Sequence, residues 1–385
     1  MRRNSIILAI SCFFILQAVS FSYGQIAGQE IKIGLILEKS GWGAEEGITE
    51  EIGAMMAAEE INAAGGIGGV PIKLVVYDDG SNPTQSINVA KKLIFEDKVL
   101  AILGPAFSSQ VEVVFPVANR AETPIVSPLS TKIGITEKNR PWTFRNTIGS
   151  EHVFKHLIER WAKDFNIKKV AIIYDAKDRM SQDDATIVFP DALKQLGISI
   201  VTSVTYMTND MDFSAQLTKI QSLQPDGMII SGLRNEAAQI VKQAKQKGVK
   251  MPITGGFELV APRFIELGGK EVEGMYLIHS SWIAGNPDPK MQEFVKKAEK
   301  RGAKVQIGTL RMYDCVQISK YIIGKMAVTN KPEDLANDRN KIRQGWATLK
   351  DYKGVEGLTS INEKGDGIKE TYLLIIKDGR YQRLQ

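Results

Sequence analysis

The sequence predicts an α/β protein made of two Rossmann-like lobes, each built on a parallel central sheet. Short apolar, β-branched runs alternate along the chain with longer amphipathic runs, which is the pattern of strands joined by helical crossovers. This alternation occurs as two successive series, one before and one after about residue 150. The 385 residues also exceed the roughly 250–300 that one core usually supports, which favours two domains.

The first series predicts strands at 31–37, 73–77, 100–103 and 124–126, with helices at 48–61, from Pro83 and from about Ser108. The second predicts strands at 169–174, 199–206 and 227–231, with helices at 150–164, 184–196, 213–223 and 235–247. The last third predicts a strand at 275–279, helices at 289–301, 309–326 and 340–349, and a hairpin at 371–381. We expect these last elements to complete the two sheets and not to form a third domain.

The N-terminus has the order of a secretory signal peptide, which we assign to residues 1–24. Arg2 and Arg3 precede an apolar run at 6–18, and small residues follow. That run is shorter than the ~20 residues of a membrane-spanning helix. Cleavage after Ser20, an uncleaved anchor and a lipoprotein at Cys12 are the alternatives. The expected location is the periplasm.

Removal of residues 1–24 would leave Cys315 as the remaining cysteine and lower the formal charge from +5 to +3. This near-balance gives no case for nucleic acid as a partner.

Catalytic and metal-binding motifs are weak in this sequence. The glycines at 65–69 follow a helix and precede a strand, which is the reverse of a dinucleotide fingerprint. His152 and His156 are spaced i, i+4, but no third ligand is evident nearby. Cys315 lacks a neighbouring base. We therefore expect neither an enzyme nor a resident metal or cofactor.

Two segments at the ends of neighbouring strands predict an anion-binding site. Residues 104–109, Gly-Pro-Ala-Phe-Ser-Ser, leave a strand and open a helix, while Ser130 and Thr131 follow the next strand. Ligands bind at the carboxyl ends of such strands, and hydroxyls with helix-start N–H groups suit a carboxylate. The alternative is that Ser108 and Ser130 are ordinary helix caps.

The sequence resembles the type I periplasmic binding proteins of branched-chain amino acid ABC transporters over about the whole chain after residue 24. The resemblance rests on ordered motifs: Ile31-Lys32-Ile33-Gly34 with Ser40-Gly41, the segment 60–67, Tyr77-Asp78-Asp79, Gly104-Pro105 with Ser108, residues 124–128 and Phe144-Arg145-Asn146. It implies two lobes joined by three crossover strands near Thr147, Ser280 and Leu358. Lobe 1 would combine 25–147 and 281–357, and lobe 2 would combine 148–280 and 358–385.

The resemblance also implies which residues bind. Ser108, Ser130 and Thr131 would hold the carboxylate and ammonium of an amino acid, beside Ser109 and the backbone of Phe107 and Leu129. Trp42, in the cleft-facing segment 42–46, would cover an apolar side chain.

The second lobe departs from the family pattern. Arg179-Met180 stand where many members have Tyr-Gly, Leu233-Arg234 where an aromatic is frequent, and Phe257 where an acid is expected, with Glu258 one residue later. If Glu258 faces the cleft it can pair with an ammonium. If it does not, Arg179 and Arg234 favour a second carboxylate.

The predicted function is delivery of a small carboxylate ligand to a membrane permease by a monomeric binding protein. Branched-chain or other apolar amino acids are the first choice of ligand, and aromatic or dicarboxylic acids the second. A ligand-sensing receptor module is the alternative role.

Overall fold

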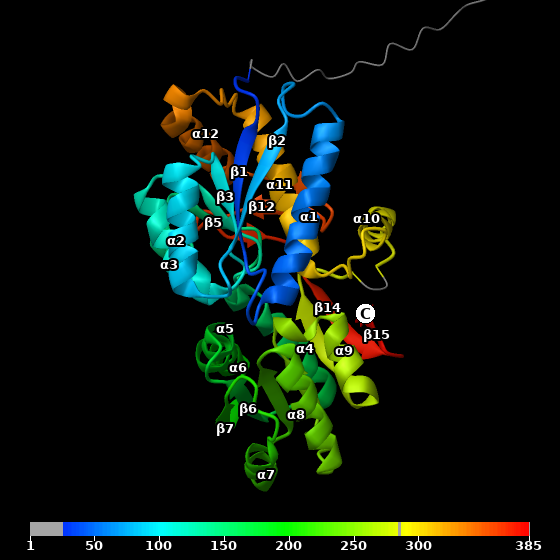
Figure 1. Cartoon of the computed structure of the whole chain (residues 1–385). Coiled ribbons are helices and arrows are strands. Elements are labelled where there is room, and N and C mark those ends of the chain that lie inside the picture. Colours follow the sequence, from blue (N-terminus) through cyan, green and yellow to red (C-terminus); the bar gives the residue numbers. More distant parts are fainter. Residues whose placement is uncertain (1–25, 284–285, 385) are drawn as a thin grey trace, which may run out of the picture.

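The fold class predicted from the sequence is confirmed by the computed structural model, which describes residues 26–283 and 286–384 (Figure 1). Sheets of five and seven strands form the centres of two lobes, and a small three-stranded sheet accompanies them. The predicted signal peptide, residues 1–24, and Cys12 lie outside the described residues. Within the described ranges, no helix combines the length and apolar character needed to cross a membrane.

The first lobe has a fully parallel sheet. Its order is β2 (Ile72–Asp78), β1 (Ile31–Leu37), β3 (Ala101–Leu103), β4 (Ile125–Ser127) and β5 (Thr143–Arg145). Strand β1 is almost entirely buried because helices cover both faces of the sheet, which explains its continuous apolar run. Strand β5 was not predicted, since its sequence, Thr-Phe-Arg, contains no apolar run.

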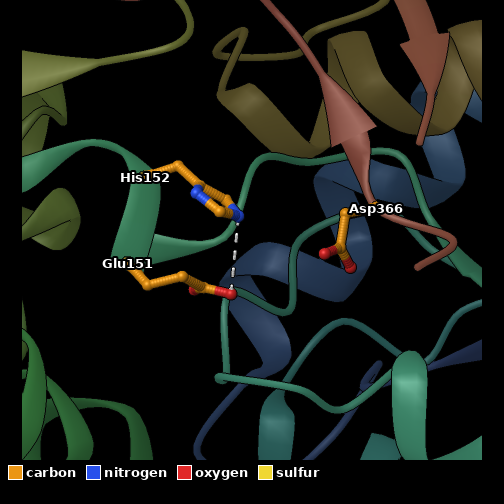
Figure 2. Close-up of side chains that lie close together, drawn as sticks. All are labelled: Glu151, His152 and Asp366. Carbon is orange, nitrogen blue, oxygen red and sulfur yellow. Dashed lines mark ion pairs between the residues drawn. The ribbon is translucent and has the colours of Figure 1, made fainter. Parts of the chain in front are cut away.

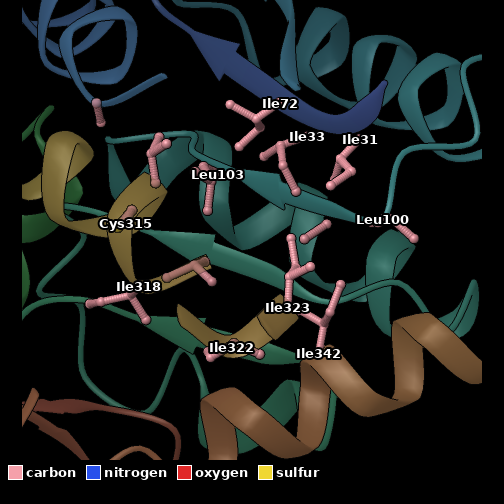
Figure 3. Packing of buried hydrophobic residues seen from close by; sticks show 14 of the residues in the cluster. Ile31, Ile33, Ile72, Leu100, Leu103, Cys315, Ile318, Ile322, Ile323 and Ile342 are labelled. Carbon is pink, nitrogen blue, oxygen red and sulfur yellow. The ribbon is translucent and has the colours of Figure 1, made fainter. Parts of the chain in front are cut away.

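Helices from both ends of the sequence build the rest of the first lobe. They are α1 (Ala44–Ala63), α2 (Pro83–Lys91), α3 (Ser108–Arg120), α10 (Pro289–Glu299), α11 (Ile307–Lys325) and α12 (Leu335–Ala347). Ile31 and Ile33 of β1 share a core with Ile318 and Ile322 of α11 (Figure 3). Helices of the C-terminal third thus pack in the first lobe.

The second lobe is built on the larger sheet. Its order is β15 (Arg380–Arg383), β14 (Tyr372–Lys377), β10 (Tyr276–His279), β9 (Ile253–Gly255), β8 (Gly227–Ser231), β6 (Lys169–Asp175) and β7 (Ser199–Tyr206). Strands β6 to β10 run parallel, while β14 and β15 form the predicted antiparallel hairpin.

The helices of the second lobe are α4 (Phe154–Phe165), α5 (Arg179–Asp183), α6 (Phe189–Gln195), α7 (Ser214–Ser222), α8 (Arg234–Gln246) and α9 (Pro262–Gly268). The helix predicted at 184–196 begins earlier, at Arg179, and passes through a π-helical turn at Asp184–Val188. Asp178 explains this start, because its side chain accepts a hydrogen bond from the Ser181 N–H and caps the first turn.

The chain passes from the first lobe to the second after β5, returns after β10, and crosses again before β14. Residues 369–371 join β13 to β14, and the position near Leu358 for the third crossing stays a prediction. Strand β12 (Leu358–Ile361) pairs with β11 (Tyr352–Lys353) and β13 (Gly367–Ile368). Ile361 packs in the first lobe's core, which holds this segment on that side.

Candidate ligand-binding site

The wall of the cleft in the first lobe begins where β3 ends. Gly104 has φ of +94° and lies so close to β1 that an added Cβ would be 2.1 Å from the Ile36 carbonyl oxygen, which requires glycine. The N–H groups of Ala106 and Phe107 then donate to the buried carboxylate of Glu38, at 3.2 and 3.5 Å. Helix α3 starts at Ser108, so the N–H groups of Ser108 and Ser109, which have no intrahelical acceptor, are available to a ligand, while those of the next two residues donate to the Phe107 carbonyl.

The loop after β4 supplies hydroxyl groups to the same wall. The Ser108 and Ser130 hydroxyls are 2.8 Å apart, which joins the two loops. The Thr131 side chain is 5% exposed, and its Oγ1 atom has no hydrogen-bond partner among the described residues. A buried hydroxyl in this state is costly, so it points to an acceptor supplied by a ligand.

The opposite wall carries charges. Arg234, the first residue of α8, lies 3.0 Å from Glu258 of its own lobe and 3.5 Å from Glu46 of the first lobe. It also donates to the Gln306 side chain at 3.1 Å. Burial alone would lower the pKa of Arg234, but Glu258 and Glu46 more than offset it, so the guanidinium stays charged. Burial raises the pKa of Glu46, although Arg234 opposes that shift.

Two adjoining hollows occupy the space between these walls, and they share Glu46, Leu129, Thr131, Met180 and Glu258. The larger measures about 620 Å³, counting space open to solvent, which suits a small organic ligand. Ion pairs across the cleft, such as Lys132 with Asp183 at 3.3 Å, hold the lobes in contact.

All the residues that the sequence predicts for the site line one or both hollows, except Trp42. These are Phe107, Ser108, Ser109, Leu129, Ser130, Thr131, Arg179, Leu233, Arg234, Phe257 and Glu258. Trp42 instead lies 56% exposed at the rim, with its ring 4.4 Å from that of Phe107. Arg179 is exposed and donates to Gln182, so it also lies at the rim. Phe257 is largely a core residue, packed against Phe154 and His279.

Several lining residues were not predicted from the sequence. Glu46 lies at the end of the segment 42–46, so its position was indicated but its role was not. Gln306 and Ile307 come from the start of α11, far along the chain from the motifs, and no local pattern marks them. Thr147, His279 and Arg311 form the floor of the hollow beside the crossovers.

Arg311 connects the crossovers through one buried guanidinium, 2% exposed. It donates to Thr147 Oγ1 at 2.6 Å in the first crossover and to Ser280 Oγ at 2.5 Å in the second. It also pairs with Glu356 at 3.0 Å, which in turn pairs with Lys369 of the third crossover at 2.7 Å. The floor of the cavity and the hinge are therefore one connected structure.

A group of possible metal ligands also lies at the hinge. One ligand atom each of Glu151, His152 and Asp366 lies within 4.8 Å of the others, and Figure 2 shows the three side chains. His156 does not belong to this group. Arg145 lies 2.6 Å from Asp366 and 3.5 Å from Glu151, so a guanidinium already compensates these carboxylates. Burial would raise the pKa of Asp366, but Arg145 lowers it below its usual value. We assign no metal to this group.

A two-lobed α/β protein with a hollow between the carboxyl ends of two parallel sheets is a cleft-binding solute receptor. The family model described as Periplasmic binding protein matches residues 30–380, and the chain belongs to that family. The resemblance seen in the sequence is thereby confirmed.

Relatives of this chain carry names that describe amino acid binding. The Leu/Ile/Val-binding protein homolog 1 of Brucella suis is 29% identical over 96% of this chain and 97% of its own length. The branched-chain amino acid transporter substrate binding protein LivJ of Streptococcus pneumoniae, solved with isoleucine, is 28% identical. It covers 92% of this chain and 98% of its own, with a TM-score of 0.80.

A solute binding protein of an ABC transporter from R. palustris, solved with benzoate, has a TM-score of 0.79. It covers 92% of this chain and 95% of its own. At 20% identity this likeness shows the shared fold alone.

Proposed function

We propose that the protein binds a neutral, apolar α-amino acid in its cleft and delivers it to the membrane permease of an ABC importer. The observation that carries this proposal is that the two walls of the cleft offer complementary groups, hydrogen-bond donors on one and carboxylates on the other. Neutral donors that lack an acceptor, chiefly the Thr131 hydroxyl, face a wall on which two carboxylates share one guanidinium. An α-amino acid brings a carboxylate to the first wall and an ammonium to the second.

The charge balance favours an amino acid over a simple carboxylic acid. Glu46 and Glu258 against Arg234 leave one negative charge in the cavity, which a ligand ammonium neutralises. Asp178 also lines the smaller hollow, where its carboxylate caps α5 and the oppositely charged Arg179 lies at the rim. A dicarboxylate is disfavoured because Arg234 is already engaged by two carboxylates.

One part of the larger hollow is lined by apolar side chains. Leu129, Met180, Ile283 and Ile307 line the larger hollow, and a branched aliphatic side chain would bury its surface there. Aromatic acids are the second candidate class, because these same residues would accept a ring. Such a ligand would leave the negative charge uncompensated.

We further propose that the protein acts in the periplasm as a monomer, with residues 1–24 as its signal peptide. The family and the named transport relatives support an importer role over a sensing role. Deletion of the gene should abolish high-affinity uptake of the bound amino acid if the role is transport. Retained uptake with a lost transcriptional or behavioural response would support the sensing role.

Isothermal titration calorimetry of the mature protein, refolded free of ligand, tests the ligand class. The panel contains L-leucine, L-isoleucine, L-alanine, benzoate, 4-hydroxybenzoate and succinate. We expect saturable binding of the neutral amino acids and at least tenfold weaker binding of the three acids. Binding of benzoates without binding of any amino acid would overturn the proposal.

A further inference from the structure

Arg234 lies at the junction of the inner cavity and an outer hollow. Ala261, Pro262, Ile283 and Gln306 line both spaces together with it. The outer hollow has charged residues of both signs, but the basic ones are paired there: Lys304 lies 2.7 Å and Arg263 3.6 Å from Glu266. Because Arg234 lines both spaces, a long side chain that extends from the inner cavity into the outer hollow would pass its guanidinium.

The position of this guanidinium is fixed by partners from both lobes. Glu258 and Glu46 accept from Nη2, while Gln306 accepts from Nη1 and itself donates to Glu45 at 2.7 Å. Without Arg234, the carboxylates of Glu46 and Glu258 would leave two negative charges at this point of the cavity. Two uncompensated carboxylates attract a ligand with two cationic groups.

We propose that Arg234 is a charge filter, which supplies one fixed positive charge between Glu46 and Glu258 and so restricts the ligand to a single cationic group. The inference rests on the proposed function, since it concerns which amino acids the cleft accepts. Neutral amino acids have the one ammonium that the remaining charge can neutralise. Lysine, arginine and ornithine bring a second cation, which meets a guanidinium of like charge inside a desolvated space.

The test compares L-leucine with L-lysine on matched variants by isothermal titration calorimetry. Wild type should prefer leucine over lysine by at least 100-fold. Arg234→Met should lower that preference at least tenfold and should raise the affinity for lysine itself. The ratio of the two affinities separates loss of the charge filter from a general loss of lobe closure. Loss of closure would weaken the binding of leucine and lysine by the same factor and leave the ratio unchanged.

Three further variants control this result. Arg234→Lys keeps the charge and should keep the preference for leucine. Arg160→Met removes an equal charge from the outer face of helix α4, where Arg160 pairs with Asp164, and should leave both affinities unchanged. Arg234→Met combined with Glu46→Gln removes one carboxylate along with the guanidinium and should restore the preference for leucine. Arg234→Gln, which keeps a donor for Gln306, replaces Arg234→Met if the latter does not fold.

Failure of the filter is distinguishable from failure of the proposed function. If wild type binds leucine and a folded Arg234→Met or Arg234→Gln variant keeps the same preference, the filter is wrong and the function stands. Equal binding of lysine and leucine by wild type also overturns the filter alone. If wild type binds benzoate and no amino acid, both proposals fall.

Discussion

The two walls of the cleft differ in how the chain builds them. The first-lobe wall is made by two neighbouring loops, in which Ser108 and Ser130 are 22 positions apart, and these loops present neutral donors to the ligand. The second-lobe wall carries ions, and its central pair joins Arg234 to Glu46 over 188 positions and across the lobes. The neutral donors need an acceptor from the ligand, whereas the charged wall keeps one excess negative charge when the lobes meet. We infer that the first-lobe wall, called the anchoring wall below, holds the ligand. The charged wall around Arg234, called the selective wall, determines which ligand binds.

Glu258→Gln should have the largest effect, because it removes a carboxylate from the selective wall. We expect affinity for neutral amino acids to fall about 30-fold or more, since truncating one partner of a buried charge pair costs about 2–5 kcal/mol. Isothermal titration calorimetry measures the change, and Glu293→Gln on the exposed face of α10 is the matched control. Unchanged affinity would exclude Glu258 as the ammonium partner.

Thr131→Val should have the next largest effect, because it removes the free hydroxyl of the anchoring wall. A hydrogen bond to a charged group contributes about 1.5–3 kcal/mol, so affinity should fall roughly 10- to 100-fold. All carboxylate ligands should lose affinity by a similar factor, whereas Glu258→Gln should act on those with an ammonium. Thr186→Val, at an exposed position of the second lobe, is the control. A loss restricted to ligands with an ammonium would contradict the assignment of the two walls.

Glu38, which accepts hydrogen bonds from the backbone of the anchoring wall, makes the stability of the folded protein depend on pH. Burial, with the neighbouring Asp79, raises the pKa of Glu38 to about 8, although its backbone donors oppose the shift. The folded protein therefore holds a proton that the unfolded chain releases above its ordinary pKa of 4.5. Stability is fully present below that value and falls as pH rises toward 8, by up to about 1.4 kcal/mol per pH unit for one such group.

Glu38→Gln should flatten this decline, because the amide imitates the protonated carboxyl. Urea unfolding at intervals between pH 5 and pH 9 measures the slope for variant and wild type. Some slope should remain, since burial also raises the pKa of Asp184 to about 8. Parallel profiles for the two proteins would show that Glu38 is ionised in the fold throughout this range.

Most of the fold could be predicted because long buried strands and amphipathic helices leave local patterns. Strand β1 and helix α11 are examples, and their mutual packing follows from the parallel sheet needing cover on both faces. The packing of β12 could not be predicted, because Ile361 is an ordinary apolar residue and only the tertiary structure shows that it joins the core of β1. The start of α5 at Arg179 was missed because a single cap, Asp178, sets it.

The two walls of the site also differ in how far the sequence predicts them. Ser108, Ser130 and Thr131 follow strand ends, so position in the sequence predicts position in space. The triple contact of Arg234 with Glu46, Glu258 and Gln306 needs three elements from separate parts of the chain. The sequence left open whether Glu258 and Arg234 face the cleft, and the geometry adds that they face each other.

Trp42→Ala should have the smallest effect, because Trp42 belongs to the rim of the anchoring wall and not to either hollow. Its ring packs against Phe107 at a tilt of 56°, with 4.4 Å between centroids, while more than half of the residue is exposed. An aromatic pair contributes about 0.5–1.5 kcal/mol, and exposure keeps the loss near the lower end, so affinity should fall about twofold to threefold. Phe95→Ala, at another exposed aromatic of the first lobe, is the control. A loss above about 30-fold would mean that Trp42 moves inward to cover the ligand, and the anchoring wall would then include an apolar lid.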